Sequence, residues 1–200
     1  MLYGESTRVA DVLSTKEAAV LSDVKEKRLR RLVRELHVGR RAKGTNRNLF
    51  GPRDVLFLSL TRELPVSLDR KTTRDLYDLV SKGLTEKGRW KSKNERLILG
   101  DMVIIDSRKV LGEVSRKLSV YRSGSARVTR DPETMGGEAV FKGTRISVAH
   151  VGALATRGIP LEQILEDYPR LRERDVVLAA LLHRMGRRPG RPRKPLALRR

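Results

Sequence analysis

The sequence contains no cysteine and only three histidines among its 200 residues. Without cysteine, the chain forms no disulfide, binds no zinc through thiolates and has no thiol nucleophile. Long hydrophobic runs are also missing: the longest, such as residues 55–58 and 102–105, fall far short of the roughly 20 residues that span a membrane. Residues 1–6 lack the basic and apolar segments of a secretory signal. We therefore expect a cytoplasmic protein without a membrane partner.

Acidic residues are scarce relative to basic ones. The chain has 24 Asp and Glu against 44 Lys and Arg, a formal net charge of +20. Charge of one sign repels itself in a compact protein unless a polyanion accepts it, so nucleic acid is the leading partner class. The excess is uneven: residues 1–60 carry +6, residues 61–130 carry +8, residues 131–185 carry −1 and residues 186–200 carry +7. We therefore do not expect attraction to DNA to be the main role of the third block.

The N-terminal block carries the signals of two short helices. Ser14 and Glu17 have capping-box spacing, which predicts a helix start, and Ser22-Asp23 predicts the cap of a longer helix that runs to about Leu36. On this second helix, leucines and a valine form one face, and the opposite face is basic: Lys27, Arg30, Arg31 and Arg34. A cationic second helix after a tight turn suits the DNA major groove, although a basic face can also be simple solvation.

The residues that follow favour the DNA-binding interpretation. Basic segments 38–43 and 46–50 flank a Gly44-Thr45 turn and predict a small hairpin, and Pro52 suits the start of a further helix. Residues 12–64 thus resemble the winged helix-turn-helix of MerR-like regulators and phage excisionases, and we assign residues 1–64 to this domain. The resemblance implies that helix residues approach DNA and hairpin residues contact phosphates. They are Lys27, Arg28, Arg31 and Arg34 in the helix and Arg40, Arg41, Lys43 and Arg47 in the hairpin.

Residues 65–125 carry no motif that we can tie to chemistry. They predict a helix over 73–82, two short strands near 97–105 and another helix after Val110. Trp90, in a basic run, could lie beside a nucleic-acid backbone, but a lone Trp more often covers the edge of a core. We expect an α+β connector that could serve as a dimerisation element of a homodimer.

The third block has an ordered set of motifs. Asp131-Pro132, Gly136-Gly137 and Lys142-Gly143-Thr144-Arg145-Ile146 precede three expected helices, over 148–156, 161–168 and 174–185. Residues 131–182 resemble the small bacterial DUF433 family, with departures: Ala139 and Ser147 replace common prolines, and Arg172 replaces a Ser or Thr cap. The resemblance implies a homeodomain-like three-helix domain over 126–185. Members are often encoded beside PIN-domain ribonucleases and regarded as VapB-type antitoxins.

The tail, residues 186–200, is basic and interrupted by proline, which prevents a helix. Gly190-Arg191-Pro192-Arg193 resembles AT-hook segments and the minor-groove arm of invertase-type recombinases. The resemblance implies that Arg191 enters a minor groove, flanked by Arg188 and Arg193. A non-specific basic tail is the alternative.

Signals of catalysis are weak. His37, His150 and His183 lie on different expected elements without metal-ligand spacing, and the acids of 162–167 fit a solvated helix face. We expect no enzyme, metal or cofactor.

The expected fold is mainly α with small β elements: an N-terminal winged helix-turn-helix and a C-terminal homeodomain-like three-helix bundle. The expected function is the antitoxin of a bacterial type II toxin-antitoxin system, which binds operator DNA and neutralises a PIN-domain ribonuclease toxin. The alternative is a stand-alone MerR-like or excisionase-like transcriptional regulator.

Overall fold

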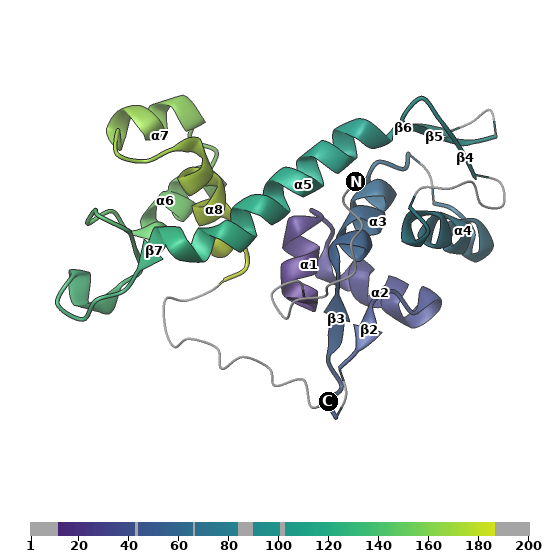
Figure 1. The fold of residues 1–200 in the computed structure, drawn as a ribbon, viewed down its shortest axis with the longest axis horizontal. Coiled ribbons are helices and arrows are strands. Elements are labelled where there is room, and N and C mark those ends of the chain that lie inside the picture. The colour runs from purple at the N-terminus through teal and green to yellow at the C-terminus, as the bar shows by residue number, and fades with distance from the viewer. Residues whose placement is uncertain (1–11, 43, 66, 84–89, 101–102, 187–200) are drawn as a thin grey trace. The chain divides into compact units, whose positions relative to one another are not determined.

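The structure, a computed structural model, describes residues 12–42, 44–65, 67–83, 90–100 and 103–186. It consists of two compact units, Met1–Arg122 and Ser123–Arg200. Both are mainly helical with small antiparallel sheets, which confirms the expectation of a mainly α protein with small β elements (Figure 1). Within the described ranges, no helix is both long and apolar enough to cross a membrane.

The first unit has two parts that follow each other in sequence. The earlier part comprises β1 (Leu13–Ser14), α1 (Thr15–Leu21), α2 (Glu26–Leu36), β2 (Arg40–Arg41), β3 (Asn48–Phe50) and α3 (Pro52–Arg62), and its sheet has the order β1-β3-β2. The later part comprises α4 (Arg70–Ser81), β4 (Trp90–Lys93), β5 (Arg96–Leu99), β6 (Val103–Asp106) and α5 (Ser107–Ser123), and its sheet has the order β4-β5-β6.

The helix starts show where local patterns suffice and where they fail. The capping box of α1 is present: the Ser14 amide donates to Glu17 Oε2 at 2.8 Å, and the Glu17 amide donates to Ser14 Oγ at 3.4 Å. The predicted Ser22-Asp23 cap of α2 is wrong. Ser22 ends α1, where its hydroxyl donates to the Ala18 carbonyl at 2.7 Å, and α2 begins after Lys25. A serine between two helices can bond to carbonyls at the end of the first or to amides at the start of the second, and here its hydroxyl donates to carbonyls of the first.

The core of the first unit contains buried residues from both of its parts. The leucines of α2 are buried, as their spacing predicts, together with Phe50 and Phe57. Trp90 is fully buried, and its indole N–H donates to the Thr72 carbonyl at 3.0 Å. Trp90 is therefore a core residue and does not face a nucleic-acid backbone. The strand β4 that carries it, whose residues read as a basic run, was not predicted.

The second unit consists of short β and 3-10 segments followed by three helices. They are η2 (Gly124–Arg127), β7 (Val128–Thr129), η3 (Met135–Gly137), β8 (Val140–Phe141), α6 (Val148–Thr156), α7 (Leu161–Asp167) and α8 (Glu173–Arg184). Strands β7 and β8 pair antiparallel, and Phe141, Ile164 and Ala179 belong to the apolar core beneath the helices. Helices α6 and α8 are in close contact at Gly152, where an added Cβ would lie 2.5 Å from the Ala179 carbonyl oxygen.

Two family departures have local compensation. Ser147 caps α6, because its Oγ accepts from the His150 amide at 3.2 Å. At α8 the N-cap is Arg172, and Asp175, three residues on, accepts from the Arg172 amide at 3.0 Å. The carboxylate of Asp175 also takes two hydrogen bonds from the Arg127 guanidinium, at 3.0 and 2.7 Å. Both helix starts are thus satisfied by side chains of this sequence.

Candidate nucleic-acid interface

The outer face of α2 is cationic and mostly unpaired. Its inner face is fixed by buried leucines, so the basic residues on the opposite side are exposed. Arg30 pairs with Glu26 one turn away, at 2.5 Å. Lys27, Arg31 and Arg34 form no hydrogen bond or ion pair with any other described residue. At a rise of about 1.5 Å per residue, these three side chains span about 10 Å of the helix, enough to meet more than one phosphate of a nucleic acid.

Arg28 differs from its neighbours on α2. Its Nη2 donates to the Thr61 carbonyl at 2.7 Å, in the last turn of α3. Burial, and then the charge of Arg31, lowers the pKa of the Arg28 guanidinium. A cation at the C-terminal end of a helix also meets the negative end of the helix dipole. Arg28 therefore ties α2 to α3 on the flank of the basic face.

The β2–β3 hairpin adds a second exposed cationic surface beside α2. Arg40 pairs with Leu49 and Arg41 with Asn48 in the antiparallel register, and the Ala42 amide donates to the Arg47 carbonyl at 2.9 Å. The side chains of Arg40, Arg41 and Arg47 are exposed and, within the part of the chain that the structure describes, have no acidic partner. Four predicted DNA contacts, Lys43, Arg188, Arg191 and Arg193, lie outside the described residues, as does the tail from residue 187 onward.

The approach to the hairpin requires a glycine. Gly39 has φ +82°, a conformation that disfavours any side chain, and an added Cβ would lie 2.7 Å from the Leu49 carbonyl oxygen. The chain thus leaves α2 and enters β2 through a position that only glycine fits. This fixes the hairpin relative to the end of α2.

Helix α4 positions both the basic helix and the hairpin. Arg74 Nη1 donates to the Leu36 carbonyl at 2.5 Å, at the C-terminal end of α2. The Tyr77 hydroxyl donates to Asp54 Oδ1 at 2.8 Å and accepts from the Gly39 amide at 3.4 Å. Burial, and then the adjacent Asp54 carboxylate, raises the pKa of Tyr77 to about 12. The sequence analysis did not predict the positioning roles of Arg74 and Tyr77. The leucines at helical spacing predict the helix that carries them, but they contain no information about polar partners 38 residues away.

An internal ion-pair cluster holds the α1–α2 turn against α5. Arg62 contacts Asp23 and Glu113, each at 3.0 Å, and Lys117 contacts Glu113 at 2.6 Å and also Asp23. Hydrogen bonds from Arg62 and Lys117 lower the pKa of Glu113 to about 2. The Tyr121 hydroxyl adds a hydrogen bond to the Glu17 carboxylate, at 2.7 Å. These acidic side chains are thus paired within the unit, whereas the unpaired cations of α2 and the hairpin face solvent.

Within the described ranges, no group of three or more His, Asp and Glu side chains could hold a metal ion. The acids Glu162, Glu166 and Asp167 are exposed on or beside α7, as expected of a solvated face.

Comparisons with known proteins concern the second unit. Residues 128–181 match the model of a family described as "Protein of unknown function (DUF433)". No curated protein and no solved structure matches the chain. The match nearly coincides with residues 131–182, where the motifs predicted it, so the resemblance of this segment to DUF433 is confirmed.

Proposed function

We propose that the first unit binds DNA as a winged helix-turn-helix. In this proposal α1 and α2 form the helix-turn-helix, α2 lies in the major groove, and the β2–β3 hairpin is the wing that contacts phosphates. One observation carries the proposal: a helix and the adjacent hairpin present six exposed cations without acidic partners among the described residues. They are Lys27, Arg31, Arg34, Arg40, Arg41 and Arg47.

The magnitude of the charge supports DNA over simple solvation. An acid one turn away can offset an exposed cation on a helix, as Glu26 offsets Arg30. None of the six cations forms such an ion pair with a described residue. If each neutralises one phosphate, the slope of log K against log salt is about −5.

The second part of the proposal concerns the second unit. We propose that its three helices form a homeodomain-like bundle that neutralises a PIN-domain ribonuclease, which makes the chain an antitoxin that also binds its own operator as a homodimer. The confirmed resemblance of residues 128–181 to DUF433 supports this reading. The near-neutral charge of residues 131–185 favours a protein partner over DNA for this unit.

The DNA-binding proposal is tested with the full chain and a DNA fragment from upstream of its own reading frame. The triple variant K27Q/R31Q/R34Q is expected to bind at least about 100-fold more weakly and to reduce the salt slope by about 3. The matched control K91Q/K93Q/R96Q removes the same charge from the exposed face of the β4–β5–β6 sheet. Equal losses in both variants would show that net charge, not the α2 face, determines binding.

The antitoxin proposal is tested by co-expression with the neighbouring reading frame. Co-purification with a PIN-type product, and relief of its growth inhibition, is the expected result. A chain that binds DNA but neither co-purifies with nor neutralises such a product is a stand-alone regulator of the MerR-like or excisionase-like kind.

A further inference from the structure

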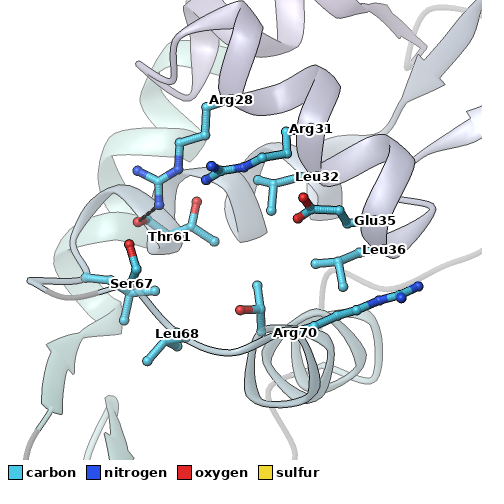
Figure 2. Close-up of a pocket in the computed structure, with 11 residues that line it drawn as sticks. Arg28, Arg31, Leu32, Glu35, Leu36, Thr61, Ser67, Leu68 and Arg70 are labelled. Atoms are coloured by element: carbon cyan, nitrogen blue, oxygen red, sulfur yellow. Dashed lines mark hydrogen bonds between the residues drawn. The ribbon is translucent and has the colours of Figure 1, made fainter.

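A cavity of about 110 Å³ lies between α2, the end of α3 and the start of α4. Figure 2 shows the guanidinium groups of Arg28 and Arg31 at one side of it, with Arg28 donating to the Thr61 carbonyl. Ser67 also lines the cavity. Leu32 and Leu68 supply apolar surface to the same cavity. The lining therefore combines three arginines, with Arg70 as the third, the Glu35 carboxylate, hydroxyl groups and an apolar wall.

The two guanidinium groups are not neutralised where they meet. Arg28 has a neutral carbonyl as its hydrogen-bond partner, and Arg31 has no partner within the described ranges. Burial and the charge of Arg31 lower the pKa of Arg28, which means that the neighbourhood disfavours this second positive charge. Glu35 also lines the cavity, yet it forms no ion pair with Arg31 although it lies one turn along the same helix. An anion placed between the arginines relieves this repulsion.

We infer that this cavity binds a small ligand through an oxyanion group, a phosphate or a carboxylate, held by Arg28 and Arg31 with the Ser67 hydroxyl as a further donor. Guanidinium groups donate paired hydrogen bonds to such groups. A site needs roughly 10–15 Å³ of such space to hold one water, so the cavity has room for a tetrahedral oxyanion and a few further atoms. The leucines suit a ligand whose remaining atoms are apolar.

The site also bears on DNA binding, and this step rests on the proposed function of α2. Arg31 belongs both to the cavity and to the exposed basic face of the helix. A bound anion neutralises the charge that a DNA phosphate would otherwise meet. Ligand and DNA therefore compete, and each lowers the affinity of the other by the same factor.

The test titrates inorganic phosphate into the full chain, at constant ionic strength and without DNA, and follows binding by calorimetry or phosphorus NMR. R31Q is expected to weaken phosphate binding by about tenfold or more, as for the loss of one charged hydrogen bond. S67E, which places a carboxylate on an exposed segment at the cavity, is expected to abolish it. R34Q removes the same charge from α2 outside the cavity and should change the affinity less than about twofold.

Three results overturn the inference. The first is an equal loss in R31Q and R34Q, which means non-specific attraction. The second is retention of full phosphate affinity in S67E. The third is an absence of saturable phosphate binding while R31Q still reduces the salt slope for DNA by about 1, which means that a DNA phosphate is the occupant.

Competition with DNA is measured separately by exchanging chloride for phosphate at fixed ionic strength. The native chain is expected to lose DNA affinity and R31Q to be insensitive to the exchange. If the chain binds no DNA at all, the proposed function fails, but the phosphate titration still decides the cavity. If phosphate binds and DNA affinity is unchanged, the competition is refuted and the site stands.

Discussion

The two units use their polar groups differently. In the first unit, Arg62 and Lys117 form ion pairs with acidic residues of the α1–α2 turn and α5. Helix α2 and the hairpin carry exposed cations that form no ion pair with a described residue. In the second unit, a buried Asp175 is bonded to Arg127, and apolar packing of α6 against α8 forms the centre. The first unit thus depends on several separable polar links, and the second on one close helix contact. Removing one polar link should therefore destabilise the first unit only locally, whereas disrupting the α6–α8 contact should destabilise the whole second unit.

The largest expected effect is at the contact between α6 and α8. G152A places a Cβ 2.5 Å from the Ala179 carbonyl oxygen, so the helices must separate, which we expect to cost about 3 kcal/mol of unfolding free energy of the second unit. Denaturant unfolding measures the change. G112A is the matched control, because nothing lies within 4 Å of an added Cβ on α5, and it should stabilise by about 0.5–1 kcal/mol. If G152A lowered the DNA affinity as well as the stability, the result would contradict the expectation that the two units act independently.

The next effect is at the hairpin. G39A meets the Leu49 carbonyl and needs a left-handed backbone, so we expect about 2 kcal/mol of destabilisation and a misplaced hairpin. Gly44 also has a positive φ, +74°, but open space around it, so G44A isolates the backbone cost at about 1 kcal/mol. The measurements are denaturant unfolding and DNA affinity. If both variants lower the DNA affinity equally, the close approach at Gly39 has no special role.

A pH-dependent effect distinguishes the second unit. Burial of Asp175 opposes its ionisation, but hydrogen bonds from Arg127 and the Arg172 amide outweigh burial and lower its pKa. A lowered pKa contributes stability above the ordinary value near 4, and that stability is lost as pH falls below it. D175N should cost about 2 kcal/mol at neutral pH and flatten the acid side of the stability profile of this unit. An unchanged profile would show that the Asp175–Arg127 pair contributes no pH dependence.

The smallest effect concerns one polar link of the first unit. Y77F removes the hydroxyl that joins Asp54 to the Gly39 amide, and we expect a loss of about 1 kcal/mol with a modest fall in DNA affinity. Y168F, which removes an exposed contact to His150 in the second unit, is the control and should leave DNA affinity unchanged. Fluorescence anisotropy with labelled DNA compares the two. Equal effects would mean that Tyr77 does not position the hairpin.

Local patterns predicted much of this structure. The basic face of α2, the turn at Gly44 and the three helices of the second unit follow from capping residues, glycines and helical spacing, which depend on neighbours in sequence. The contacts of Arg74 with Leu36 and of Lys117 with Asp23 could not be predicted in this way, because these partners lie 38 and 94 residues away along the chain. The wrong prediction of a cap at Ser22 has a different cause. A serine can cap either end of a helix, and packing decides which of the two ends it caps.

The position of Tyr121 has a consequence for modular exchange. Its hydroxyl donates to the Glu17 carboxylate on α1, and the second unit begins two residues later, at Ser123. A domain junction between residues 122 and 123 therefore lies C-terminal to the contacts that α5 makes through Lys117 and Tyr121. Replacing the C-terminal unit by an unrelated domain should leave the first unit intact, so the same N-terminal module could be reused with other partners by gene fusion.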